Sequence, residues 1–161
     1  MTSSSDIFLM VQTKRAGKLK GEAVAPEHEG EIEIESWSWT VKASSALGTT
    51  AATGRRSYSG LSVVKRIDSA STALLSALAT NDEIKEAKLT MRKAGEGQVD
   101  YFLITLKEAR VTQVEHATDD SGGTRESVTI AFRKVEVEYR VQQSSGGRGA
   151  SLVFVDELIA S

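Results

Sequence analysis

The sequence predicts a mainly β protein: a compact antiparallel β-barrel or two-sheet sandwich with one short flanking α-helix. Most apolar segments alternate with a period of two residues, which is typical of half-buried strands. Two segments, residues 99–116 and 126–141, contain no turn residue and far exceed the usual strand of about five or six residues. Only the segment around Leu74, Leu75 and Leu78 has the apolar spacing of a helix.

Length and composition predict one domain over residues 1–161, with 40% hydrophobic residues to build its core. The chain contains no cysteine, which excludes disulfides, thiolate metal sites and thiol catalysis. Lys and Arg number 20 and Asp and Glu 22, so the net charge of −2 favours neither nucleic acid nor an anionic membrane as a partner. Residues 1–5 are expected to be flexible, as is a link from residue 144 to a short last strand at 152–155.

The first strand is expected at residues 7–11, followed by a polar loop over 13–28. The next strand, residues 31–42, changes phase: Ile32 and Ile34 occupy even positions, whereas Trp37 and Trp39 occupy odd ones. A uniform strand cannot bury both sets on one face. We therefore expect either a bulge near residues 35–36 or a strand that passes from one packed environment into another.

Residues 43–56 are rich in Ser, Thr, Ala and Gly and are expected to form a long exposed loop. Strands are expected at 58–67 and 87–93, with the helix between them capped by Asp68, Ser69 or Ser71 and a turn at 94–97. The strand at 126–141 repeats the phase change after Phe132, which indicates a sheet that bends around a corner. Apolar residues on both faces of the long strands have two open explanations: cover by the helix and loops, or packing beyond one core.

No complete enzyme motif is present, so the sequence predicts a protein that is not an enzyme and that uses no cofactor and no metal ion. The two histidines, His28 and His116, stand in or beside polar loop sequence, where solvent exposure is expected. Glu31, Glu33 and Glu35 form a row of carboxylates, which an exposed polar strand face explains better than a metal site or an acid/base pair.

One segment carries a positive signal. In residues 36–40, Trp37 and Trp39 face one way, while Ser36, Ser38 and Thr40 face the other. Two large aromatic side chains on one face indicate deep burial or a subunit contact. The small hydroxyl side chains would suit a smooth polar surface such as the wall of a channel.

Residues 31–39, EIEIESWSW, resemble the Ser-Trp-Ser-Trp strand of the haemolysin-coregulated proteins, the tube-forming component of bacterial type VI secretion. Further matches follow in the family's order: Gly21-Glu22, His28, Val64-Lys65 with Asp68 and Ser71-Thr72, AKLTMRKAG at 87–95, Tyr101, ITLK at 104–107, and Glu126-Ser127-Val128 with Phe132 and Tyr139. The resemblance covers residues 6–142. Thr40 departs from it, because the family often has glycine there, and residues 43–56 and those beyond 142 have no family pattern.

The resemblance implies a structural subunit that forms homohexameric rings. The rings stack into a tube inside a contractile sheath, with a spike protein at the tip and secreted effectors in the lumen. It also implies assembly in the bacterial cytoplasm and export by the apparatus itself. The short apolar run at 7–11, with no basic residue before it, predicts neither a signal peptide nor membrane insertion.

Three sets of residues are assigned on this basis. Ser36, Ser38 and Thr40 are expected to face the lumen. Seven residues are expected to serve the core or subunit packing: Trp37, Trp39, Tyr101, Phe102, Ile104, Phe132 and Tyr139. Leu47, Thr49, Arg55 and Arg56 are expected in the loop that contacts the adjacent ring. Two alternatives remain open, a phage-like tail-tube subunit and a monomeric ligand-binding β-barrel.

Overall fold

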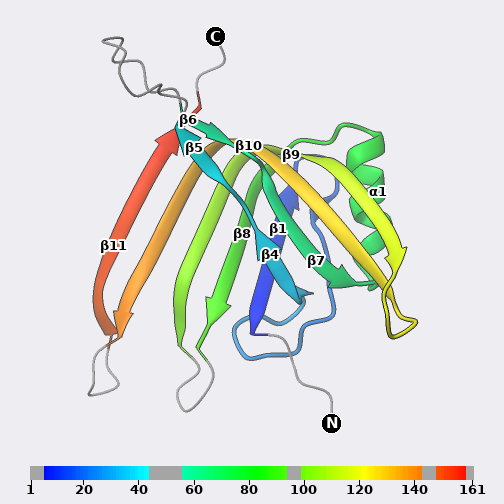
Figure 1. Ribbon diagram of the computed structural model, residues 1–161, viewed down its shortest axis with the longest axis horizontal. Coiled ribbons are helices and arrows are strands. Elements are labelled where there is room, and N and C mark those ends of the chain that lie inside the picture. Colours follow the sequence, from blue (N-terminus) through cyan, green and yellow to red (C-terminus); the bar gives the residue numbers. More distant parts are fainter. Residues whose placement is uncertain (1–5, 44–55, 94–98, 143–147, 159–161) are drawn as a thin grey trace.

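The computed structural model describes residues 6–43, 56–93, 99–142 and 148–158 (Figure 1). Within them the chain is mainly β with one helix, as predicted. The elements in chain order are β1 (Ile7–Thr13), β2 (Gly17–Lys18), β3 (Ile32–Ile34), β4 (Ser36–Ser38), β5 (Val41–Ala43), β6 (Arg56–Tyr58), β7 (Leu61–Arg66), α1 (Ser71–Ala79), β8 (Ile84–Arg92), β9 (Asp100–Thr118), β10 (Thr124–Gln142) and β11 (Arg148–Glu157).

The main sheet has the antiparallel order β2-β1-β8-β9-β10-β7-β4, with β11 added to β10 and β3 added to β1. The phase change at residues 35–36 marks the point where the chain leaves one edge of this sheet for the other. Ile32 and Ile34 pair with β1, and three residues after Ile34 the side chain of Trp37 stands opposite Val63 of β7. The predicted passage between two packed environments is therefore confirmed. The sheet curls into a sandwich-like fold rather than a continuously hydrogen-bonded barrel.

The predicted corner in the long strands is also present. Side chains up to Phe132 in β10 are buried at even positions, and from Val135 onward the buried or half-buried apolar side chains stand at odd positions. The paired strand β9 changes face at the same level, between Leu106 and Ala109. Glu108 lies between these two residues with φ of +50°, in the left-handed region that non-glycine residues seldom adopt. The sheet bends along this line, so its two halves face different surroundings.

Helix α1 packs beside β9, at the end of the molecule away from β11 (Figure 1). Its N-cap position is Ala70, which has no side chain able to cap it, although Asp68 Oδ1 accepts a hydrogen bond from the Ala70 backbone N–H at 2.9 Å. Leu74 is buried, whereas Leu75 is 43% and Leu78 is 36% exposed. The expected stripe of three leucines is therefore wrong at two positions, and Ser71 and Ala77 are buried instead.

A buried ionic cluster joins the start of α1 to the sheet. The Lys65 Nζ donates to Glu126 Oε1, and neither side chain is exposed. Glu126 also accepts hydrogen bonds from Ser71 Oγ at 2.9 Å and from His116 Nε2 at 2.7 Å. Burial raises the pKa of Glu126, but the bonds from Lys65 and His116 outweigh burial and hold that pKa below its usual value.

The last strand differs most from expectation. The structure shows ten residues in β11, Arg148–Glu157, where only 152–155 were expected. Ala43 and Arg56 pair with each other in the β5–β6 hairpin, so the ends of the expected loop 43–56 are strands. Residues 44–55, including Leu47, Thr49 and Arg55, lie outside the described residues, as does the expected turn at 94–97.

Candidate functional site

The apolar inner face of the sheet becomes progressively uncovered toward β11. One cross-strand row consists of Leu89, Ile104, Val137 and Phe154. Leu89 and Ile104 are completely buried, Val137 is half-buried and Phe154 is 52% exposed. The neighbouring row shows the same trend, from Met91 at 5% to Leu152 at 60% exposed. The apolar face of the sheet therefore extends beyond the part that other segments of the chain cover.

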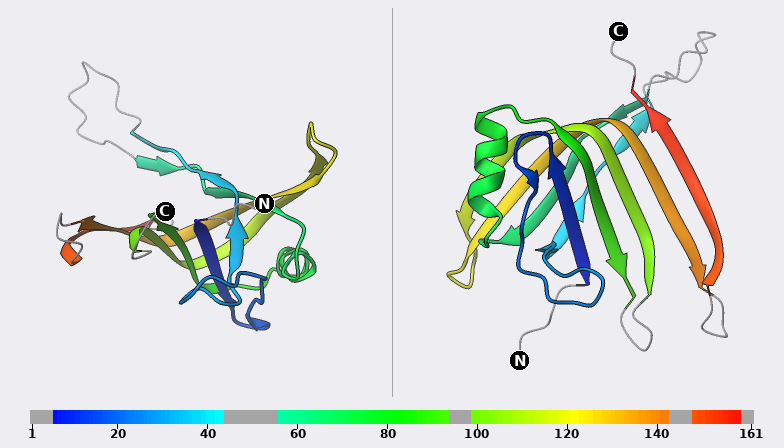
Figure 2. Two further views of the ribbon diagram at one scale, coloured as in Figure 1. Left: turned by 90° about the horizontal axis from the view of Figure 1, so that it is seen from below. Right: turned by 180° about the vertical axis from the view of Figure 1, so that it is seen from behind.

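The buried part of this face is covered by aromatic side chains of β4 and β6 and by Trp39, which follows β4. Trp37 stacks on Phe102 with ring centroids 6.3 Å apart, and Trp39 lies 6.1 Å from Phe132. Tyr58 completes the second group, 5.3 Å from Phe132 in an edge-on arrangement. Figure 2 shows the bent sheet from two further sides, with β11 at its far end from α1.

Strand β11 is also an edge strand within the described part of the chain, because its recorded pairing is with β10 alone. Its outer face carries Val153 and Val155, which are exposed like Leu152 and Phe154 on its inner face. An edge strand presents unpaired backbone N–H and C=O groups. A long apolar edge of this kind is a template for pairing with another chain.

The structure places the predicted hydroxyl row on the opposite side from the tryptophans. Ser36, Ser38 and Thr40 are all exposed, whereas Trp37 and Trp39 pack against the core. The Thr40 backbone N–H donates to Ser59 Oγ at 2.8 Å, which anchors the end of the row to the turn before β7. The row presents three small hydroxyl side chains at the surface.

The remaining predicted packing residues line the inner face at different depths. Ile104 is fully buried and Phe132 nearly so, Tyr101 and Phe102 are half-buried, and Tyr139 is 42% exposed. Tyr139 thus belongs to the uncovered part of the face. Sequence reasoning missed its partners there, Leu152 and Phe154, although their alternation within 152–155 was visible as a strand signal.

Arg56 does not stand in a free loop, because it is held by the last strand. Asp156 of β11 accepts hydrogen bonds from Arg56 Nε at 2.6 Å, Arg56 Nη2 at 2.8 Å and Tyr58 Oη at 2.6 Å. The bonds from Arg56 and Tyr58 lower the pKa of Asp156 to about 2. Burial, with the bond to Asp156, raises the pKa of Tyr58 to about 12. We call this group, Arg56, Tyr58 and Asp156, the Asp156 clamp.

Both histidines are engaged by carboxylates. His28 is buried, contrary to expectation: its ring stacks on Phe8 at 4.5 Å, and its nitrogens lie 2.9 Å from Glu31 and 3.1 Å from Asp100. The contact with Glu31 lies within the loop before β3, and the contact with Asp100 holds that loop to the start of β9. Within the described residues, no group of three His, Asp or Glu side chains is arranged to hold a metal ion.

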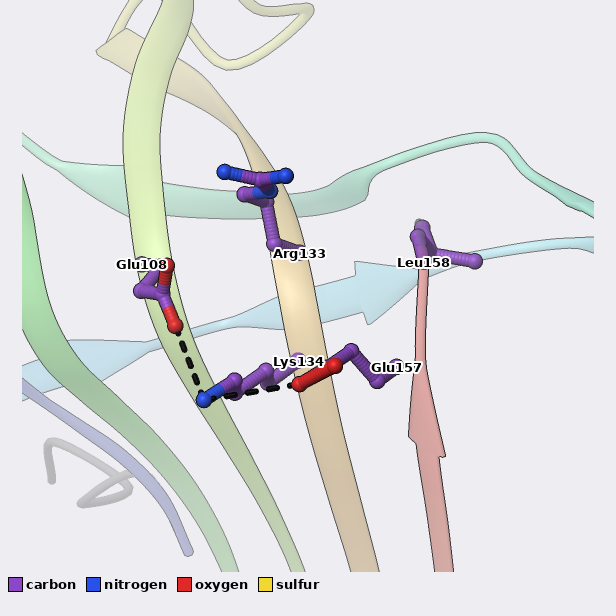
Figure 3. A pocket seen from close by; sticks show the side chains of 5 residues that line it. All are labelled: Glu108, Arg133, Lys134, Glu157 and Leu158. Atoms are coloured by element: carbon purple, nitrogen blue, oxygen red, sulfur yellow. Dashed lines mark ion pairs between the residues drawn. The ribbon is translucent and has the colours of Figure 1, made fainter. Parts of the chain in front are cut away.

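A surface recess of about 260 Å³ lies at the corner of the sheet (Figure 3). Four of its five lining residues are charged, and Lys134 Nζ bridges Glu108 at 3.0 Å and Glu157 at 3.4 Å. Arg133 and Leu158 complete the lining. Because its charges are largely paired with one another, the recess offers little to an apolar ligand.

None of the helices in the described parts of the chain has the length and apolar character needed to cross a membrane.

The sequence profile of a family described as "Type VI secretion system effector, Hcp" matches residues 8–139. The chain is 36% identical over 149 residues to Protein hcp1 of Pseudomonas aeruginosa, covering 89% of this chain and 88% of that protein.

Solved structures agree with the sequence matches. Hcp1 from Salmonella typhimurium superposes with a TM-score of 0.75 at 26% identity, over 95% of both chains. Hcp1 from Escherichia coli EAEC 042 has a TM-score of 0.78 at 22% identity, over 96% of this chain and 99% of that chain. The baseplate of the anti-feeding prophage shares the fold more distantly, with a TM-score of 0.53 at 10% identity over 85% of this chain and 95% of that chain. With the profile spanning most of its length, the chain belongs to the Hcp family of type VI secretion proteins.

Proposed function

We propose that this Hcp-family protein is the structural subunit of a type VI secretion tube, in which six copies close into a ring and rings stack into the tube. The single observation that carries the proposal is the uncovered apolar face of β10 and β11 with its free edge. Burial of one large apolar side chain contributes roughly 1.5–3 kcal/mol. Several such side chains together therefore supply a substantial driving force for association with another copy.

A second copy is the occupant that fits this surface. A free edge can accept a strand from a neighbour, and the neighbour's own β11 then stands free for the next copy. When a contact joins two different surfaces of the subunit, each added copy is rotated by the same angle relative to the one before. The copies close into a ring if that angle is a whole fraction of a full turn. The cryo-EM structure of the anti-feeding prophage baseplate, a distant structural neighbour, is 6-fold symmetrised, which supports a sixfold arrangement.

The hydroxyl row fits the lumen of such a ring. Ser36, Ser38 and Thr40 are exposed and small, so they leave the bore open and offer hydrogen bonds to effectors in transit. The remaining partners of the proposal are a spike protein at the tube tip and a contractile sheath around it. Assembly takes place in the bacterial cytoplasm, and the finished tube is then expelled. The protein itself performs no catalysis.

Native mass spectrometry of the purified chain tests the proposal. A ring of six copies, together with tubes in electron micrographs at high protein concentration, is the expected result. A single subunit at all concentrations would overturn it and favour the monomeric ligand-binding barrel. The phage-like tail-tube alternative shares the ring architecture, and the genes that flank the coding sequence separate the two.

A further inference from the structure

The β5–β6 hairpin is too short to hold its own position. Within the described residues it forms a separate two-stranded sheet of three residue pairs, and Val41, Lys42 and Ala43 are all exposed. An isolated two-stranded hairpin is at best marginally stable in water. Its orientation must therefore be set from outside. Tyr58 anchors one end by packing on Trp39, 5.6 Å away.

The other end is anchored to the edge strand rather than to the body of the protein. Arg56 closes the hairpin opposite Ala43, and its guanidinium binds both oxygens of Asp156. The Arg56 Nη2 also donates to the Glu157 backbone oxygen at 3.0 Å. A two-point arrangement of this kind fixes direction as well as distance. Figure 1 shows β5 and β6 reaching the end of β11.

The same strand face carries both the clamp and the proposed docking surface. Asp156 is two residues beyond Phe154, so their side chains point to one side of β11. The Arg56 side chain is 49% exposed in the single subunit. A neighbour seated on β11 would displace water from the ion pair and strengthen it, because Coulomb attraction grows as the surrounding dielectric falls.

We propose that Asp156 is a positioning residue that couples ring closure to ring stacking, by holding the β5–β6 hairpin on the strand to which the next subunit binds. The inference rests on the proposed ring function and adds an order of events. Docking on β11 tightens the clamp, the clamp directs the hairpin, and the hairpin then meets the adjacent ring. By linkage, a hairpin already held in place favours docking to the same extent.

Asp156→Asn tests the proposal in the full-length protein, since asparagine keeps the shape but removes the charge. Rings should keep the wild-type mass, while tubes in electron micrographs become at least about threefold shorter as charge-assisted bonds are lost. Hydrogen exchange at residues 41–43 and 56–58 should become at least about tenfold faster, because local opening needs less free energy. The combined substitution Arg56→Asp with Asp156→Arg should restore both tube length and protection.

Glu136→Gln is the matched control. The Glu136 carboxylate lies on the neighbouring strand opposite Val155, on the other face of the sheet. The substitution should leave ring mass, tube length and hairpin exchange unchanged.

Wild-type tube length and exchange in Asp156→Asn would overturn the inference. By the same linkage, rings of this variant should form at a somewhat higher protein concentration but with unchanged mass. Absence of rings at every concentration would overturn the inference, since Asp156 would then act at the ring seam itself. If the wild type formed no rings, the proposed function would fall, whereas unchanged hairpin exchange in Asp156→Asn would count against the clamp alone.

Discussion

Lys65 and Glu126 stand directly opposite each other on β7 and β10 and form an ion pair with no exposed side-chain surface. Asp68, 2.9 Å from the Lys65 Nζ, and Ser71 bring the start of α1 into the same cluster. One buried charge pair therefore fixes both the packing of two strands and the position of the helix.

Replacement of Lys65 by methionine should destabilise the fold by about 3–5 kcal/mol, because the Glu126 carboxylate then remains buried without its cation. Denaturant unfolding at a fixed protein concentration measures the change. Lys134→Met, which breaks an exposed pair with Glu108, is the control and should cost less than about 1 kcal/mol. Equal losses in the two variants would contradict the role given to the buried pair.

The Asp156 clamp should weaken at both extremes of pH. The pKa of Asp156 is lowered to about 2, so its contribution to stability is complete above its ordinary value of 3.8 and is lost as the pH falls toward 2. The pKa of Tyr58 is raised to about 12, so its contribution is complete below 10.0 and is lost as the pH rises through 12. Ultraviolet titration of the phenolates should show a step near pH 12 that Tyr58→Phe removes. An identical titration curve in that variant would refute the assignment.

Phe154→Asp should convert rings to single subunits, because a charge placed on the apolar face cannot be buried against a neighbour without a partner. Native mass spectrometry reports the change, and circular dichroism should show an intact fold. Leu75→Asp is the matched control, since Leu75 is nearly as exposed but lies on α1, away from β11. Rings that survive Phe154→Asp would remove this face from the proposed seam.

A cysteine introduced at Ser38 should react with a bulky maleimide much more slowly in rings than in dissociated subunits. The proposed lumen limits access of a large probe to the hydroxyl row, whereas a small probe should reach the site in both states. Because the chain has no native cysteine, the introduced thiol is the only one labelled. Equal rates with the bulky probe in both states would show that Ser38 faces outward.

Replacement of residues 45–54 by a short Gly-Ser linker, with β5 and β6 left intact, should leave rings of six but weaken their stacking. The lost contacts are each weak and are repeated around every ring of the proposed tube, so tube length is the sensitive measure. Light scattering and electron micrographs report it. Disappearance of the rings themselves would assign this segment to the ring seam instead.

Local periodicity was sufficient to predict the two positions where the sheet changes surroundings. The even-to-odd change between Ile34 and Trp37, and again between Phe132 and Val135, appears in the structure as a strand switch and a corner. Both follow from the rule that strand side chains alternate between faces. Periodicity cannot say which apolar face lacks a cover, since Phe154 and Ile104 follow the same pattern and differ only in what lies over them.

Contacts between distant segments could not be predicted from one sequence. The local sequence predicts an ordinary loop histidine at His28, and only the fold places Asp100, 72 residues away, beside it. Arg56 and Asp156 are separated by 100 residues, and neither belongs to a local motif. The orientation of α1 also depends on the sheet, which buries Leu74 and leaves Leu75 exposed although both suit an apolar helix face.

The exposed apolar edge strand β11 follows every other described strand in the chain. A ribosome extends a polypeptide from its amino end at roughly 5–20 residues per second. The other strands are therefore synthesised before β11, the segment proposed to bind a second copy. If β11 forms the ring seam as proposed, an unfinished chain has no surface through which to join a ring, and the order of synthesis protects the nascent protein from premature association.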